Sequence, residues 1–371
     1  MSRKPLLSGS AVVAILLGYL LLWPVGIDPV AWTPPPDPGL PAQCQGNAGL
    51  AAATLLAAEL DGPEAIAIDA QGRLLTGTRD GRIVRTDGEQ LATLANTGGR
   101  PLGMKLTPDG ATLVVADGRK GLLSLTLGDG GASPSQRVLA TAQGGVPFGF
   151  TDDVELMRDG TIVFTDASSR FGDGEWKLDL LEHGPHGRLL ALRPGAADPE
   201  LLKGGLHFAT GVAAGPDGES VVVCEMGSYR LHRVFVSGAH AGQSSVFVEN
   251  LPGFCDNVTW SPERRAYWVA LGSPRNPLVD AMGPHPWLRK LTLRLPTALQ
   301  PKPARHAVAL AYDDTGALVD CRQHEAPDAY SPVASVIERA GVLYLGSFML
   351  KGIAKVAIDP PPAAPPAGAA E

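Results

Sequence analysis

The sequence predicts an all-β protein, a six-bladed β-propeller preceded by a single N-terminal transmembrane helix. A unit of short strand, polar turn and stronger strand recurs six times along the 371 residues. The 45 Gly and 33 Pro suit short strands and turns rather than long helices. An apolar stretch without acid or base stands near the N-terminus and accounts for the predicted helix.

The repeats supply the blades. Asp-Gly turns such as Asp109-Gly110 and Asp159-Gly160 stand between β-rich runs, which is a hairpin signal. Repeats of about 40 to 60 residues built from hairpins are typical of a propeller. The six inner strands are expected to begin at Glu64, Leu102, Asp152, Thr210, Asp256 and Ala334.

A fourth strand is expected to complete each blade. For the first five blades, the candidates are 90–94, 137–140, 200–202, 245–249 and 308–312. The sixth repeat has no such strand after Val356, whereas an unassigned apolar run at 54–60 precedes the first repeat. We expect this N-terminal strand to complete the last blade, because closing the ring covers a sheet edge that would otherwise be exposed.

The N-terminal apolar run at 6–25 is predicted to be a transmembrane signal-anchor. Arg3 and Lys4 precede it, so the positive-inside rule places residues 1–5 in the cytoplasm and the propeller on the extracytoplasmic side. A cleaved signal peptide is the alternative.

The remaining segments flank the propeller, which is expected at 50–358. The Pro-rich stretch at 26–49 is predicted to be an extended tether that holds the propeller off the membrane. A Pro/Ala tail at 359–371 is predicted to be disordered. The four cysteines show no metal-binding spacing. Cys44 and Cys321 could tie the ends of the fold together, and buried free thiols are the alternative for all four.

Three of the six positions that begin the inner strands are acids. Inner strands line the channel of a propeller, so Glu64, Asp152 and Asp256 should meet at one mouth. Like charges that close need protons or a cation. An oxygen-rich, roomy cluster suits Ca²⁺ better than Mg²⁺, and Thr210 and Asn257 can add neutral oxygens. Alternatively, the acids accept backbone N–H groups and hold blades together.

Other polar residues have two interpretations each. His183 and His186 lie in a loop that either binds metal or is solvated. His207 sits either near the mouth or as a core or rim histidine, and Arg100 reaches either an anionic substrate or a neighbouring loop. The net charge of −7 argues against a nucleic-acid partner.

Several segments taken together carry a family resemblance. They resemble the strictosidine synthase-like and gluconolactonase (senescence marker protein) superfamily, which includes the paraoxonases, and within it the membrane-anchored adipocyte plasma membrane-associated group. The resemblance implies a catalytic Ca²⁺ held by a Glu of the first blade and Asn or Asp of later blades. The segments are 62–64, 77–83, 99–103, 164–169, 247–254 and 343–348, and the implied ligands are Glu64, Asp152, Asp256 and Asn257.

The chain departs from the family pattern at three positions. Thr210 replaces the usual Asn of the fourth repeat, which weakens the expected metal shell. Leu102 stands where paraoxonases have a catalytic His. Ala334 lies near the place of the last-blade Glu of strictosidine synthase, so amine–aldehyde condensation is not expected.

The sequence thus predicts a membrane-anchored, calcium-dependent hydrolase of small lactones or aryl esters. The cation would polarise the carbonyl, and Asp256 or Asp152 would act as base toward water. The alternative is a non-catalytic, membrane-tethered binding propeller whose cation is structural. The expected partners are a small-molecule ester or lactone and the membrane, without nucleic acid.

Overall fold

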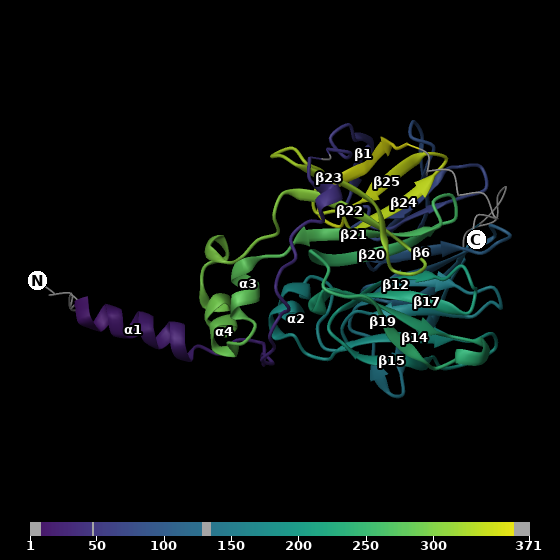
Figure 1. Cartoon of the computed structure of the whole chain (residues 1–371). Helices are drawn as coiled ribbons and strands as arrows, with labels where there is room; N and C mark the ends of the chain where they lie inside the picture. Colours follow the sequence, from purple (N-terminus) through teal and green to yellow (C-terminus); the bar gives the residue numbers. More distant parts are fainter. Residues whose placement is uncertain (1–8, 47, 128–134, 360–371) are drawn as a thin grey trace, which may run out of the picture.

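The computed structural model describes residues 9–46, 48–127 and 135–359, and its strands form six four-stranded antiparallel sheets (Figure 1). The innermost strand of each sheet contacts the innermost strand of the next, and the last contacts the first, so the sheets form a closed ring. This confirms the predicted all-β six-bladed propeller.

The strands follow the chain blade by blade. The first three blades are β2 (Ile66–Ile68), β3 (Leu74–Gly77), β4 (Arg82–Thr86) and β5 (Leu91–Asn96); β6 (Pro101–Leu106), β7 (Thr112–Asp117), β8 (Gly121–Thr126) and β9 (Ser135–Ala140); and β12 (Thr151–Leu156), β13 (Ile162–Asp166), β14 (Gly187–Leu192) and β15 (Glu200–Leu206). The last three are β16 (Ala209–Ala214), β17 (Ser220–Glu225), β18 (Arg230–Phe235) and β19 (Ser244–Val248); β20 (Gly253–Ser261), β21 (Ala266–Pro274), β22 (His306–Asp313) and β23 (Leu318–Glu325); and β24 (Ser335–Arg339), β25 (Val342–Gly346), β26 (Lys351–Ala357) and β1 (Thr54–Asp61).

The other elements are short. The helices are α1 (Gly9–Leu22), α2 (Trp176–Glu182), α3 (Pro277–Met282) and α4 (Pro286–Arg294), with single 3₁₀ turns η1 (Ala42–Cys44), η2 (Met226–Ser228), η3 (Gly238–His240) and η4 (Thr297–Leu299) and a small hairpin of β10 (Ala142–Gln143) and β11 (Val146–Pro147).

The Asp-Gly turns explain why the hairpins form where they do. In blades 2, 3 and 4 the carboxylate of Asp109, Asp159 or Asp217 accepts the backbone N–H two residues further on. The glycine after each of them has φ between +70° and +84°, which a side chain would disfavour. Each turn therefore fixes the register of the strands around it.

The ring closes as the sequence predicted. β1, from the N-terminal end of the propeller, pairs antiparallel with β26, and Thr54 stands opposite Lys355. The last blade consequently has the order β1-β26-β25-β24, and its outer edge comes from the other end of the chain.

The expectation for the fifth blade was wrong in one respect. The run at 308–312 is part of β22, the third strand, and β23 is the fourth strand. The insertion at 275–305, which carries α3 and α4, separates the second strand from the third and makes the third look like an outer strand in the sequence.

The inner strands approach the neighbouring blades so closely at the mouth that side chains are excluded. A Cβ atom on Gly346 would lie 1.7 Å from the backbone oxygen of Glu64, and one on Gly211 would lie 2.4 Å from the Cα of Asn257. Neighbouring blades are also linked there, because the backbone N–H of Val212 donates to a carboxylate oxygen of Asp153 at 2.9 Å.

The long insertions lie at the same end as the start of the inner strands. Since the second strand of each blade runs back toward that end, segments joining second and third strands emerge at the mouth. The insertion with α2 in blade 3 and the one with α3 and α4 in blade 5 are of this kind (Figure 1). They supply the walls of the site described below.

The N-terminal segment has two parts. Of the predicted anchor at 6–25, residues 9–22 form α1, residues 23–25 follow it without helical structure, and residues 6–8 lie outside the described residues. No helix within 9–46, 48–127 and 135–359 is long and apolar enough to cross a membrane.

The segment after α1, the predicted tether, is extended and contacts the propeller. The backbone N–H of Val30 donates to the carbonyl of Glu182, and that of Trp32 donates to the carbonyl of Gly283. The Trp32 ring stacks on His183 with ring centroids 4.0 Å apart. The segment thus packs against the insertions at the mouth.

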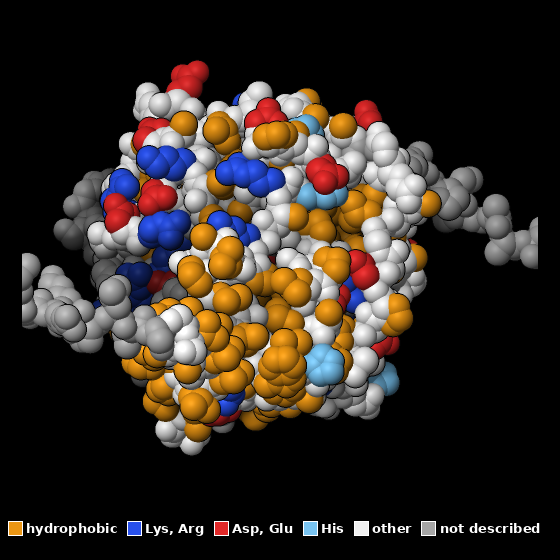
Figure 2. Space-filling view, turned by 90° about the vertical axis from the view of Figure 1, so that its left-hand side faces the viewer, with side chains coloured by type: hydrophobic (Ala, Val, Ile, Leu, Met, Phe, Trp, Pro, Cys, Tyr) orange, Lys and Arg blue, Asp and Glu red, His pale blue; other side chains and the backbone are white. Residues whose placement is uncertain are grey.

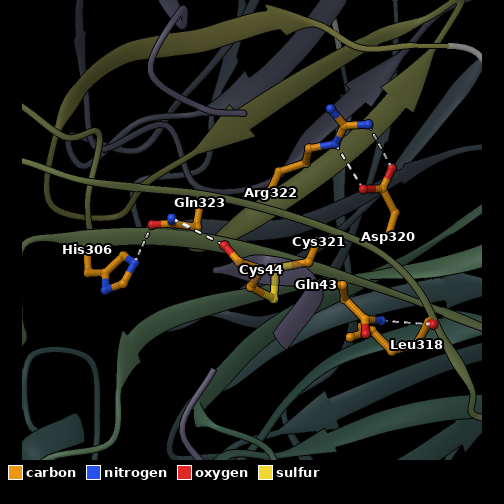
Figure 3. Close-up of a disulfide and its surroundings, with 8 residues drawn as sticks. All are labelled: Gln43, Cys44, His306, Leu318, Asp320, Cys321, Arg322 and Gln323. Carbon is orange, nitrogen blue, oxygen red and sulfur yellow. Dashed lines mark hydrogen bonds and ion pairs between the residues drawn. A yellow bond between two sulfur atoms is a disulfide. The ribbon is translucent and has the colours of Figure 1, made fainter. Parts of the chain in front are cut away.

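A disulfide joins Cys44 of η1 to Cys321 of β23, so one of the two possibilities for the cysteines is realised (Figure 3). The Gln323 side chain donates to the carbonyl of Cys44 at 3.4 Å and fixes the same contact. Cys224 and Cys255 are free and buried.

Replacing Gly346 by alanine should destabilise the protein by about 1–3 kcal/mol, because the new methyl group would force blades 6 and 1 apart. Thermal or urea unfolding measures the effect. Gly26→Ala is the matched control, since no atom lies within 4 Å of its Cβ position. Equal stability of the two variants would contradict the backbone contact.

Removing the disulfide with Cys44→Ser/Cys321→Ser should lower the unfolding free energy by about 2–5 kcal/mol, because the bond closes a very long loop of the unfolded chain. Reductant should lower the melting temperature of the native protein and leave that of the double variant unchanged. A native protein insensitive to reductant would show that the bond does not form.

Candidate metal centre

The structure brings the three acids of the inner ring together. One carboxylate oxygen from each of Glu64, Asp152 and Asp256 lies within 4.8 Å of the other two. All three residues are buried, with at most 4% of the surface of each exposed. Glu64 stands two residues before β2, Asp152 is in β12 and Asp256 is in β20, so three different blades supply the cluster.

Burial and mutual repulsion change how these acids titrate. Burial raises the pKa of Glu64 to about 7, against the opposing charge of Arg100. Burial, followed by the charges of Glu64 and Asp256, raises the pKa of Asp152 well above its ordinary value. Burial and the Glu64 charge do the same for Asp256. Without a cation the cluster therefore holds protons at neutral pH.

The donor atoms fit a hard cation. Among the described residues, one oxygen of Asp152 and the amide oxygen of Asn257 are buried without a hydrogen-bond partner. Unsatisfied buried polar atoms are costly, so their presence beside the acids indicates a missing ligand. Oxygen donors alone, without sulfur or imidazole, favour Ca²⁺ or Mg²⁺ over transition metals.

Arg100 adjusts the charge of the cluster. Its guanidinium lies 3.7 Å from a carboxylate oxygen of Glu64, is buried, and donates to the carbonyl of Gly62 at 3.1 Å. It therefore bonds a neighbouring loop, one of the two roles considered for it, and it also lines the cavity below. Three carboxylates and one guanidinium leave two negative charges, which one divalent cation would neutralise.

The two neutral candidates take different roles. Thr210 donates its hydroxyl hydrogen to the backbone carbonyl of Asp256 at 2.9 Å, so it positions the strand that carries an acid. Asn257 donates its backbone N–H to the carbonyl of Ala334 at 2.9 Å and keeps its amide for the cluster.

The cluster opens into a cavity of about 460 Å³ whose lining is largely apolar. Such a size and composition are typical of small-molecule sites. The acids and Thr210 line it, together with an apolar wall formed by Leu102, Phe150, Trp176, Phe208, Met226, Phe254 and Phe348.

The sequence interpretation missed the phenylalanines of the apolar wall, although the repeat contains a signal for them. Phe150, Phe208 and Phe254 each stand two residues before the residue expected to begin the inner strand of blades 3, 4 and 5, which we call the ring position. Arg100 and Pro332 occupy the same place in blades 2 and 6 and also line the cavity. The ring position and the position two residues before it together encode the site.

The solvated-loop interpretation of His183 was wrong. His183 is buried at the end of α2 and stacks on Trp32 and on His207, whose ring centroid is 3.9 Å away. Burial and the neighbouring His207 lower the pKa of His183 to about 2, so it stays neutral. His186 pairs with Glu182 at 2.7 Å. These histidines hold the α2 insertion in place.

Sequence comparisons place the chain among known proteins. The strictosidine synthase family model matches residues 152–239, and the strictosidine synthase-like N-terminal model matches 44–86. Adipocyte plasma membrane-associated protein of Rattus norvegicus is 32% identical over 93% of this chain and 96% of its own. The Homo sapiens protein of that name is 33% identical over 90% and 84%. Strictosidine synthase-like 3 of Arabidopsis thaliana is 31% identical over 80% and 82%.

Solved structures share the fold. A gluconolactonase of Xanthomonas campestris superposes with a TM-score of 0.57 at 16% identity, over 84% of this chain and 91% of its own. A calcium-binding protein of Agrobacterium tumefaciens, regucalcin, gives a TM-score of 0.54 at 14% identity, over 82% and 91%. At such identities the likeness shows the propeller architecture alone.

The raised pKa values predict how the metal-free protein responds to pH. Between about 4.5 and 7 the folded protein binds more protons at Glu64 than the unfolded chain does, so stability should fall as pH rises through this window. The loss is on the order of 3 kcal/mol, at about 1.4 kcal/mol for each pKa unit. Ca²⁺ should restore more stability at pH 8 than at pH 5, and thermal unfolding with chelator or with Ca²⁺ measures both effects.

The Asp256→Asn variant tests whether repulsion between the three acids causes this loss of stability at high pH. It should raise the melting temperature of the chelated protein at pH 8 and remove the response to Ca²⁺, because it deletes one of the repelling charges and one ligand. Glu89→Gln, at an exposed acid, should change neither. A chelated protein equally stable at pH 5 and pH 8 would contradict the charge repulsion.

Proposed function

Because the chain belongs to the strictosidine synthase-like family, we propose that it is a calcium-dependent hydrolase of small lactones or aryl esters. The observation that supports the proposal most strongly is the buried cluster of Glu64, Asp152 and Asp256 beside a largely apolar cavity. Cluster and cavity together offer an electrophilic centre next to a place for an apolar substrate.

Different residues have different roles in the proposed reaction. The aromatic wall of Phe150, Phe208 and Phe254 packs on the apolar part of the substrate and excludes water from it. A Ca²⁺ held by the three acids and Asn257 would polarise the carbonyl and stabilise charge developing on its oxygen.

Proton transfer needs a base at the same place. Asp256 or Asp152 accepts a proton from the attacking water, the ester C–O bond breaks, and the proton passes to the leaving oxygen. Both carboxylates line the cavity, so both are candidates.

Two positions limit the chemistry. Leu102 is buried in the apolar wall and offers no base, and Ala334 offers no acid. A histidine-based mechanism and amine–aldehyde condensation are therefore not part of the proposal.

We also propose that the chain is attached to a membrane through residues 6–25, with the propeller on the extracytoplasmic side. Relatives over most of its length are named plasma membrane-associated proteins. The Cys44–Cys321 disulfide supports an oxidising compartment.

The second candidate is a non-catalytic, membrane-tethered binding propeller with a structural cation. Thr210, Leu102 and Ala334 favour it, because each stands where related enzymes are expected to have a metal ligand or an acid–base group.

A panel of lactones and aryl esters tests the proposal. Turnover should require Ca²⁺ and stop with chelator, and Asp256→Asn and Asp152→Asn should each lower kcat by about 10²–10⁴, the usual contribution of a general base. Glu89→Gln should retain full activity.

The outcomes separate the two functions and the two acids. Chelator-insensitive turnover, or turnover that survives Asp256→Ala, would refute the mechanism. A lower melting temperature with chelator and no turnover of any substrate would establish the structural cation. Loss of turnover in Asp152→Asn with the Ca²⁺ response in melting retained would identify Asp152 as the base.

A further inference from the structure

The helix α1 is apolar on every side. Its sequence from Gly9 to Leu22 contains no charged residue, and large side chains all around it are exposed in the described chain. A helix that docks on a protein has one apolar face and one polar face, whereas a helix apolar all round needs an apolar medium on all sides. A lipid bilayer is the medium that matches this pattern.

α1 is fixed to the mouth of the propeller. The Arg294 guanidinium of α4 donates to the backbone carbonyl of Trp23 at 2.6 Å and to that of Leu20 at 3.0 Å. Figure 1 shows α1, α4 and α3 together at the end of the molecule where α2 lies. A bilayer that receives α1 is therefore brought to α4.

The insertion that carries α3, α4 and η4 continues the apolar surface. Leu278 is 56% exposed, Trp287 is 60% exposed and Leu299 is 67% exposed. Isolated exposed apolar residues are common, but these three share one insertion next to α1. Figure 2 views the molecule from the side on which Figure 1 draws α1, α3 and α4, and it shows hydrophobic side chains gathered over the lower part of that face. We call Leu278, Trp287 and Leu299 the apolar rim.

The residues around the apolar rim are those of a membrane interface. Tyr19 lies in the last turn of α1, Trp23 directly follows that helix, and Trp287 is the second residue of α4. Aromatic rings of this kind gather where hydrocarbon meets head groups. Lys290 of α4, whose side chain is 36% exposed and lies 3.3 Å from a carboxylate oxygen of Asp28, adds a basic group beside these rings.

The same insertion forms part of the cavity wall. Its cavity-lining residues include Asn276, Val279, Thr292, Gln300 and Lys302, and Met349 of blade 6, which is 48% exposed, lines the cavity as well. The cavity is bordered by the surface that would rest on the bilayer.

We propose that the apolar rim is a membrane-docking surface, and that the cavity takes its substrate, an ester or lactone with a long apolar part, from the bilayer. The substrate part of this inference rests on the hydrolase function proposed above, and the docking part rests on the proposed attachment through α1. Docking would shield an apolar substrate from water on its way to the acids.

Fluorescent reporters on the full-length chain in phosphatidylcholine vesicles test the docking. An environment-sensitive dye on Leu278→Cys or Leu299→Cys should shift to the blue and be quenched by brominated lipid, as should one on Leu22→Cys of α1. Dyes on Val138→Cys and Leu201→Cys, exposed apolar positions on outer strands, are the controls and should do neither. Cys224 and Cys255 are buried, so the dye reaches the introduced cysteine.

Each result decides one point. Quenching at Leu22 without quenching at the apolar rim would overturn the docking and leave the attachment intact. Absence of quenching at all positions would overturn both. A blue shift at the rim without vesicles that grows with protein concentration would show that a second copy of the chain covers it, which also overturns the proposal.

Turnover tests the source of the substrate. Leu278→Ser/Trp287→Ser/Leu299→Ser changes no residue of the cavity lining. It should hydrolyse water-soluble phenyl acetate as the native protein does, but hydrolyse phenyl palmitate held in vesicles severalfold more slowly. Equal rates on the vesicle substrate would overturn the proposal. If the native protein hydrolyses neither ester, the proposed hydrolase function fails, whereas the quenching result still decides the docking.

Discussion

The backbone contact of the inner strands with the neighbouring blades at the mouth is the constraint on which the site depends. Gly346 and Gly211 let adjacent blades approach until no side chain fits between them. Glu64, Asp152 and Asp256 begin such strands and cannot move apart to relieve their repulsion. The charge of Arg100 relieves part of it, and protons or a cation must supply the rest. The geometry that makes the propeller compact thus also creates its affinity for a cation.

Much of this could be predicted from the sequence, because the signals are local and periodic. Asp-Gly turns and strand patterns gave the six blades, and the unpaired run before the first repeat gave the closure by β1. The shared register placed the three acids at one mouth. The same register marks Phe150, Phe208 and Phe254, which were missed because only one position of the repeat was compared across blades.

Other features depend on contacts that no local pattern encodes. The pairing of Arg100 with Glu64 joins loops of different blades and requires the rotation between them. The third strand of blade 5 was taken for the fourth because the insertion at 275–305 hides its partner. His183 looked solvated because Trp32, which covers it, lies far away in sequence. The proline carbonyls of the extended segment also find distant donors, such as Arg275 for Pro35 and Asn250 for Pro36.

The Cys44–Cys321 disulfide has a mechanical consequence for a chain held at its N-terminus. The strand β1 lies at the outer edge of its blade and would be the first to separate under tension applied to the segment before it. Cys44 precedes β1, and its bond to β23 intercepts the pull before it reaches that edge. The load passes instead into the outer strand of blade 5. The disulfide therefore keeps β1 paired with β26, and the ring closed, when force acts on the N-terminal segment.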